Sequence, residues 1–175
     1  MLKHFYVFIV AFVLSLSACA PRIQTLGKEN QLPQLHDTFF QTKDGIKLPF
    51  KNWGNFEAPD KIIIALHGFN DYSNAFKTFG PLASNQNILT IAYDQRGFGA
   101  TKDPGIWAGS NQFVQDLISL TYVIKQKYPQ TPLYWMGESM GGAISIIASK
   151  MVDDKTLQGI ILIAPAVWGW RHMNI

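Results

Sequence analysis

Residues 61–66, Lys-Ile-Ile-Ile-Ala-Leu, are the feature of this chain that most narrows its fold. An unbroken run of β-branched and aliphatic residues is typical of a strand buried on both faces of a parallel sheet. Similar runs over 88–93, 133–136 and 157–164 predict three more such strands. Helix-like segments separate them, and strands that alternate with helices predict an α/β protein whose mostly parallel sheet is covered on both faces.

The segments between these strands carry the expected helices and turns. Helices are predicted over 73–83, 112–128 and 139–151, the second of which has an apolar stripe and ends at Pro129. Asp44-Gly45 is a strong hairpin signal and predicts an antiparallel edge to the sheet from the segments on either side. A Rossmann-like or flavodoxin-like sheet is the alternative, but the sequence has neither a Gly-x-Gly-x-x-Gly turn after a strand nor a Walker loop.

Ser139 lies in the pentapeptide Gly137-Glu138-Ser139-Met140-Gly141, between a predicted strand and a predicted helix. The Gly-x-Ser-x-Gly pattern alone is weak, since it occurs by chance in roughly one chain in twenty of this length. In a strand-turn-helix context it predicts a nucleophile, because the tight turn lifts the serine above the sheet and places the next N–H at a helix N-terminus. The flanking glycines allow the neighbouring backbones to come close.

Two further motifs follow predicted strands. His67-Gly68-Phe69 follows the first buried strand, where a loop can supply a second oxyanion donor, so the backbone N–H groups of Phe69 and Met140 are the expected pair. His67 itself is either a general base or, the more common case, a structural support for this loop. In Asp94-Gln95-Arg96-Gly97-Phe98-Gly99, Asp94 and Arg96 are either catalytic or a charge pair that fixes the loop.

Together these motifs resemble the α/β-hydrolase superfamily, and most closely its monoacylglycerol lipase, lysophospholipase and serine-aminopeptidase-like group. The matching segments are His67-Gly68-Phe69, Asp94-x-Arg96-Gly97-Phe98-Gly99-x-Thr101, Gly137-x-Ser139-Met140-Gly141-Gly142 and Leu162-Ile163-Ala164-Pro165-Ala166. The resemblance covers roughly residues 37–170 and implies a serine hydrolase of carboxylic, lipid-like esters that uses no cofactor and no metal. The group often has His at the position of Glu138.

The family pattern also implies a catalytic acid and a histidine after the strand at 157–164. After the strand-turn-helix elbow at Ser139, the only histidine in the sequence is His172, at a position where the family usually begins its lid. Asp153 and Asp154 are expected to be solvated. We therefore expect an α/β-hydrolase sheet that is truncated after about its sixth strand and lacks the triad Asp and His. The alternative is a non-catalytic, membrane-anchored lipoprotein that binds through a hydrolase half-fold. The motifs do not distinguish an esterase from a peptidase or an acyltransferase.

The N-terminus predicts export. Residues 1–18 combine an early lysine, a short apolar run and small residues before an expected cleavage site, which is the pattern of a secretory signal peptide. Leu16-Ser17-Ala18-Cys19 resembles the lipobox of bacterial lipoproteins, which implies cleavage before Cys19 and lipidation of its sulfur. Residues 19–36 then form a tether and 37–175 the N-terminal part of the hydrolase domain. An uncleaved anchor, or a signal peptide with an incidental cysteine, is the alternative.

These features place the protein in the bacterial cell envelope, held to a membrane by its lipid, and Ala20 is compatible with sorting to the outer membrane. The formal net charge of +3 is too small to indicate a nucleic-acid partner, and no Cys/His cluster has metal-ligand spacing. With one cysteine, no intrachain disulfide can form.

Overall fold

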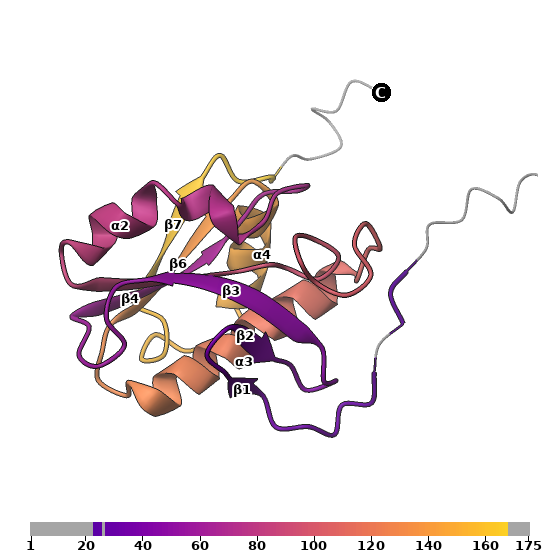
Figure 1. Ribbon diagram of the computed structural model, residues 1–175, viewed down its shortest axis with the longest axis horizontal. Helices are drawn as coiled ribbons and strands as arrows, with labels where there is room; N and C mark the ends of the chain where they lie inside the picture. Colours follow the sequence, from indigo (N-terminus) through magenta and orange to yellow (C-terminus); the bar gives the residue numbers. More distant parts are fainter. Residues whose placement is uncertain (1–22, 26, 168–175) are drawn as a thin grey trace, which may run out of the picture.

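A computed structural model describes residues 23–25 and 27–167 of the 175-residue chain. Within this part, seven strands form one sheet in the order β1-β2-β3-β5-β4-β6-β7 (Figure 1). The strands are β1 (Gln34–Leu35), β2 (Phe39–Gln41), β3 (Lys47–Trp53), β4 (Lys61–Leu66), β5 (Ile88–Tyr93), β6 (Leu133–Glu138) and β7 (Gly159–Ile163). Strands β5, β4, β6 and β7 run parallel, whereas β1, β2 and β3 pair antiparallel. The predicted α/β fold and its antiparallel hairpin edge are therefore confirmed.

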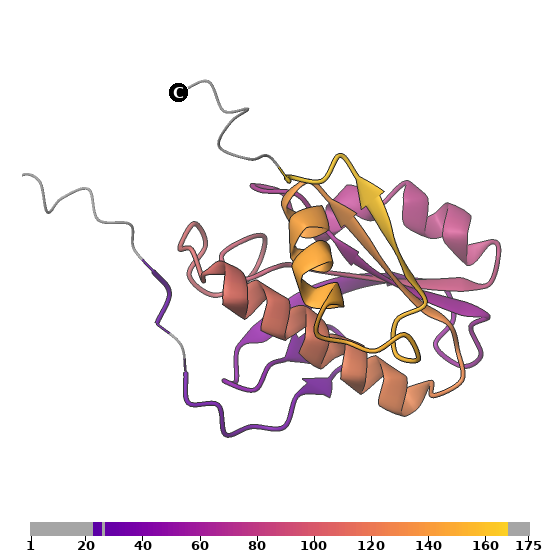
Figure 2. The same cartoon turned by 180° about the vertical axis from the view of Figure 1, so that it is seen from behind.

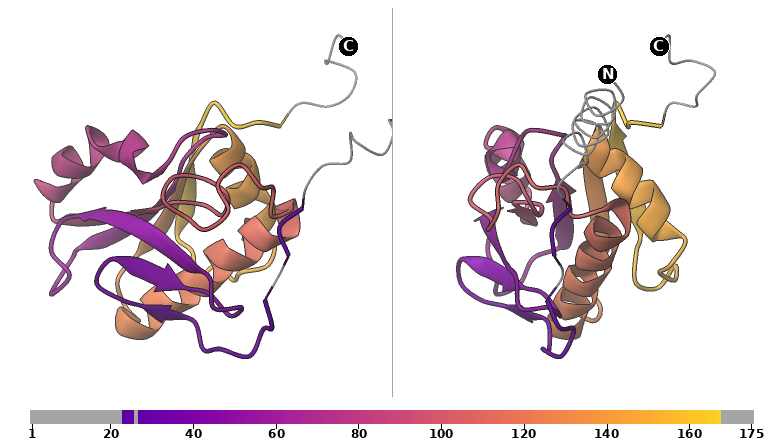
Figure 3. Two further views of the ribbon diagram at one scale, coloured as in Figure 1. Left: turned by 45° about the vertical axis from the view of Figure 1, so that its right-hand side comes forward. Right: turned by 90° about the vertical axis from the view of Figure 1, so that its right-hand side faces the viewer.

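Helices cover both faces of this sheet (Figures 2 and 3). Helices α3 (Ser110–Lys127) and α4 (Met140–Ser149) pack on one face, and α2 (Phe79–Ser84) lies on the other beside a 3-10 turn at Ser73–Phe76. One helix was expected over 73–83. The segment instead forms two short pieces, with Lys77 and Thr78 between them.

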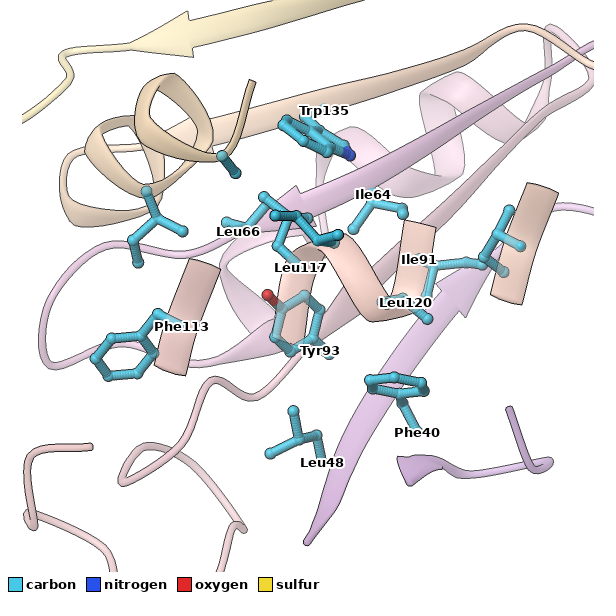
Figure 4. Packing of buried hydrophobic residues seen from close by; sticks show 14 of the residues in the cluster. Phe40, Leu48, Ile64, Leu66, Ile91, Tyr93, Phe113, Leu117, Leu120 and Trp135 are labelled. Atoms are coloured by element: carbon cyan, nitrogen blue, oxygen red, sulfur yellow. The ribbon is translucent and has the colours of Figure 1, made fainter. Parts of the chain in front are cut away.

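The alternation of side chains along β4 explains why its sequence is apolar at every position after the exposed Lys61. Ile62, Ile64 and Leu66 point toward α3 and α4, where they join the larger buried cluster with Leu117 and Trp135 (Figure 4). Successive residues of a strand point to opposite faces. Ile63 and Ala65 accordingly join the smaller cluster under α2. A strand with helices on both sides has no solvent face, so both of its faces favour apolar residues.

The segment predicted as a tether, 19–36, contacts the domain where it is described. Leu35 pairs with Phe40 in the two-residue strand β1. Ile23 forms an isolated parallel bridge with Trp107, and the Gln24 N–H donates to the Trp107 carbonyl at 2.8 Å. The count of seven strands, rather than about six, arises from β1. The predicted signal peptide and Cys19 lie outside the described residues, among which no helix has the length and apolarity needed to cross a membrane.

Candidate active site

Ser139 occupies a sharp turn between β6 and α4. Its φ of 48° and ψ of −110° fall in a region that side-chain-bearing residues rarely adopt. The turn is held on both sides, since the Ser139 N–H donates to the Ile163 carbonyl at 2.9 Å and the Ser139 carbonyl accepts from Ala166 at 2.9 Å. Surrounding structure thus imposes a strained backbone on this one serine, and such strain clusters at functional sites.

Close backbone packing around the turn requires its glycines. A Cβ at Gly137 would lie 2.4 Å from the Gly141 carbonyl oxygen, and one at Gly141 would lie 2.4 Å from the Leu66 carbonyl oxygen. Real Cβ atoms do not approach oxygen so closely. The glycines therefore let the first turn of α4 sit directly against β4 and β6, which fixes where Ser139 stands above the sheet.

The loop after β4 lies beside Ser139. A Cβ at Gly68 would be 3.4 Å from the Cβ of Ser139, so Gly68 faces the Ser139 side chain at close range. Phe69 follows in this loop, and Met140 is the first residue of α4. Among the described residues, neither the Phe69 N–H nor the Met140 N–H donates a hydrogen bond. The first orphan N–H groups of a helix are suited to hold an anion.

His67 supports this loop and has no free nitrogen for proton transfer. It is fully buried; its Nε2 accepts the Gln95 backbone N–H at 3.0 Å, and its Nδ1 lies 2.8 Å from the Gly68 carbonyl oxygen. Only the neutral ring with the proton on Nδ1 satisfies both contacts, because an N–H must donate to the carbonyl. Burial lowers the pKa of His67 from its ordinary 6.5. The prediction that His67 is a structural support for this loop, and not a general base, is therefore confirmed.

Asp94 fixes two loops at the carboxyl edge of the sheet. Its Oδ1 accepts the Ser73 N–H and its Oδ2 the Ala100 N–H, both at 2.8 Å. Arg96 does not bind this carboxylate, so the prediction that Asp94 and Arg96 pair with each other is wrong. Each residue does fix loops, Asp94 through backbone N–H groups and Arg96 through two other carboxylates.

Arg96 is buried between two other carboxylates. Its Nη1 and Nη2 donate to Asp44 at 2.7 and 2.6 Å, and its Nε and Nη2 donate to Asp116 at 2.6 and 2.8 Å. Burial acts to raise the pKa of Asp44, but hydrogen bonds from Arg96 and Thr42 bring it down to about 2. Burial raises the pKa of Asp116 to about 6, because the loss of solvation outweighs the hydrogen bonds and the positive charge of Arg96, and the nearby Asp44 carboxylate adds to the rise.

Few features of the sequence indicate these partners of Arg96. Asp44 was interpreted only as a turn residue, although it also binds the guanidinium of Arg96. Asp116 falls beside Phe113 and Leu120 on the apolar stripe of a predicted helix. A carboxylate on a stripe that faces the core needs a buried cation, and this was the signal that could have identified it.

An aromatic cavity of about 300 Å³ opens at the same edge of the sheet, lined by residues 69–72, 97–99 and 104–107. The Phe69 and Phe98 rings lie edge to face with their centroids 5.4 Å apart, and the centroid of the Trp107 ring lies 6.4 Å from that of Phe69. Ser139 does not line this cavity, but Phe69, whose loop borders Ser139, does. Tyr72 and Trp107 were not predicted as site residues because they lie in loops without a motif.

No described residue offers Ser139 a base. Besides His67, the described histidine is His36, which stacks on Phe39 near the hairpin edge. Asp153 and Asp154 are exposed, as expected for solvated residues, and Asp153 accepts the Thr156 N–H. His172 lies outside the described residues. Among residues 23–25 and 27–167, therefore, no histidine is available to act as a base for Ser139.

Comparison with known proteins identifies the lineage. Residues 57–175 match the family model of the serine aminopeptidases, S33. Rat monoglyceride lipase is 29% identical over 125 residues, which cover 71% of this chain and 41% of the rat protein. A monoacylglycerol lipase of Mycolicibacterium smegmatis is 23% identical over 124 residues, or 70% of this chain and 44% of that protein.

A solved esterase from Exiguobacterium antarcticum shares the fold, with a TM-score of 0.58 and 22% identity over 75% of this chain and 46% of the esterase. The chain thus spans less than half the length of these relatives. The strand order, the elbow at Ser139 and the family match agree with one another. The chain belongs to the serine aminopeptidase S33 family, in the monoglyceride-lipase-like group of the α/β-hydrolases.

Proposed function

We propose that the protein is a membrane-tethered serine hydrolase that cleaves carboxylic esters of lipid-like alcohols. The observation that carries this proposal is the strained backbone of Ser139 at the start of α4, beside the loop of Gly68 and Phe69. A serine held in this way presents its Oγ at the carboxyl edge of the sheet, where ligands of α/β proteins bind.

In the proposed reaction, Ser139 Oγ attacks the acyl carbonyl carbon and loses its proton to a base. The carbonyl oxygen gains negative charge, which the N–H groups of Phe69 and Met140 stabilise. Such donors contribute about 2.7–4 kcal/mol each to transition-state stabilisation. The alcohol leaves with a proton from the same base, and water then releases the acyl group from the serine.

The base and the acid are proposed to come from a region outside the residues described. Three observations support this. No described histidine is free near Ser139, and the family relatives are more than twice as long as the segment they share with this chain. Strand β7 also presents Ile161, Leu162 and Ile163 half-exposed, as expected of a strand that another element covers.

An acyl substrate, rather than a peptide, is favoured by the aromatic cavity beside Phe69. Its lining contains four aromatic rings and one carboxylate, Asp71. A carboxylate could bind a peptide amine, but the apolar walls suit an alkyl chain better. Three individual relatives, a monoglyceride lipase, a monoacylglycerol lipase and an esterase, bear names that agree with this choice, although the family model is named after an aminopeptidase.

A fluorophosphonate probe tests the nucleophile on the intact protein. We expect covalent labelling of the native protein and its loss in Ser139→Ala, because the probe reacts with activated serines. Ser149→Ala, which changes a partly buried serine at the end of the same helix, is the matched control and should label normally. Undiminished labelling of Ser139→Ala would overturn the assignment.

A second candidate function is binding without catalysis, which the lack of a base among the described residues favours. The two candidates differ in turnover of short p-nitrophenyl esters by the protein with sequence 1–175. Turnover above background that Ser139→Ala abolishes supports catalysis by this chain itself. Background turnover, combined with saturable binding of a monoacylglycerol, supports the binding function.

A further inference from the structure

The N-terminal segment joins the domain at the rim of the aromatic cavity. Ile23 bridges to Trp107, and the Gln24 N–H donates to the Trp107 carbonyl at 2.8 Å. Gln24 is 5% exposed, so this junction is packed into the domain. Trp107 lines the cavity. The chain therefore enters the fold beside the cavity, next to the loop at 100–107 (Figure 3).

Apolar side chains are exposed around the same opening. Ile23, Phe69, Tyr72 and Trp107, here called the aromatic rim, are between 38% and 67% exposed. Large apolar side chains that gather at one place on a surface mark an interaction site. Trp and Tyr are the residues enriched where a protein meets the headgroup level of a membrane, because their rings combine an apolar body with a polar tip.

The distance from the proposed lipid to this rim is short. Ile23 lies four positions after Cys19, and an extended chain spans at most about 3.6 Å per residue. The lipidated sulfur is therefore within about 14 Å of the rim, plus the reach of one side chain. A domain of this size has a radius of gyration of about 14 Å. The tether is thus too short for the opposite edge of the sheet, where β4 begins at Lys61, to face the membrane.

We propose that the aromatic rim faces the lipid bilayer and that the bridge between Ile23 and Trp107 holds it there. The cavity then opens toward the membrane, and an acyl chain from the lipid layer enters it beside Phe69, whose loop borders Ser139. This inference rests on the lipid anchor of the proposed function, but not on catalysis.

Fluorescence quenching in vesicles tests the orientation. A fluorophore is attached to Tyr72→Cys on the rim or to Gln86→Cys, an exposed position at the amino edge of the sheet. Cys19 carries the lipid and does not react. The lipidated protein is placed in phosphatidylethanolamine–phosphatidylglycerol vesicles with or without a headgroup spin label. We expect quenching at position 72 to exceed that at 86 several-fold.

An insertion of about 20 Gly/Ser residues between Ala20 and Pro21 tests the role of the tether. The longer linker reaches roughly 25 Å on average, so the difference between the two labels should fall while membrane binding persists. A difference that survives unchanged overturns the tether's role. Equal quenching of the two labels without the insertion, as expected if another part of the protein covers the rim, overturns the orientation.

The same samples separate this inference from the proposed function. Absence of membrane binding overturns the lipid anchor and the orientation together. Binding with normal quenching, but without fluorophosphonate labelling of Ser139, overturns catalysis and leaves the orientation supported. The two proposals therefore fail through different measurements.

Discussion

Arg96 and Asp116 join the loop after β5 to helix α3 through two hydrogen bonds, 2.6 Å from Nε and 2.8 Å from Nη2. The same guanidinium binds Asp44 in the hairpin turn, 52 residues earlier in the chain. The next residue back, Gln95, donates to His67 from both its backbone and its side chain. A continuous set of buried polar contacts thus connects the hairpin, α3 and the loop that borders Ser139.

Loss of Arg96 should therefore destabilise the fold more than a surface change. Arg96→Met leaves two buried carboxylates without a cation, and breaking such a pair costs about 3–5 kcal/mol. Arg96→Lys should recover only part of this, because an ammonium cannot match the fork of four contacts. Urea denaturation measures the difference, with Lys102→Ala in an exposed loop as the control, expected within about 0.5 kcal/mol of the native protein. A Met variant as stable as this control would contradict the buried triad.

Ser139→Gly should make the protein more stable while it removes the proposed nucleophile. Glycine adopts positive φ without the clash that a Cβ causes, so the strain at φ 48° is relieved by about 1 kcal/mol or more. Thermal denaturation measures the gain, and the loss of fluorophosphonate labelling accompanies it. Ser139→Ala, which keeps the Cβ, should lose labelling without gaining stability. Equal melting temperatures for the Gly and Ala variants would argue against strain at this residue.

Gly141→Ala should prevent α4 from docking on β4. The new Cβ would lie 2.4 Å from the Leu66 carbonyl oxygen and 2.7 Å from the Leu66 Cβ, and forcing such a contact costs about 1–3 kcal/mol. We expect reduced stability and reduced labelling of Ser139. Gly159→Ala is the matched control, since its Cβ would meet only the Tyr134 ring at 3.5 Å, an ordinary contact. Similar effects of the two substitutions would show that the close approach is unimportant.

His67 should contribute a loss of stability as the pH drops below about 6.5, against an opposite contribution from Asp116, whose pKa is raised to about 6 in the folded protein. Burial lowers the pKa of His67 in the folded protein, whereas in the unfolded chain it is near 6.5. A group with a depressed folded pKa contributes stability above its unfolded pKa and loses it as the pH falls. Protonation of Nε2 would also break the bond from Gln95. His67→Gln should remove the His67 contribution and leave that of Asp116, so the unfolding free energy of the variant should fall less, or rise, as the pH is lowered from 7 to 5. A slope equal to that of the native protein would exclude a contribution from His67.

Cys19→Ser should release the protein from membranes, because it removes the thiol that would carry the lipid. Carbonate extraction of membranes from expressing cells measures the distribution. Ser17→Ala, which changes a neighbouring residue but keeps the cysteine, is the control and should stay in the membrane fraction. Retention of Cys19→Ser in that fraction would contradict the lipoprotein hypothesis.

Much of the architecture could be predicted from local patterns. The runs at 61–66, 88–93 and 133–136 became β4, β5 and β6, and the helices after Gly109 and Ser139 follow their apolar stripes. The elbow could also be recognised, because its glycines, its serine and its flanking elements are contiguous. The predicted helix at 73–83 broke in two. This segment packs as two short pieces under β3 and β5, where tertiary contacts override local periodicity.

By itself, the sequence determined the parallel sheet, the place of Ser139 in it and the family to which the chain belongs. Only the tertiary structure decided that Arg96 binds Asp44 and Asp116 rather than Asp94, that His67 has no free nitrogen, and that residues 23 and 24 dock on Trp107. The physical reason is the separation along the chain over which each interaction acts. Hydrophobic periodicity and turn chemistry act between neighbours in the chain, whereas the partner of a buried charge is chosen by which segments the sheet brings together.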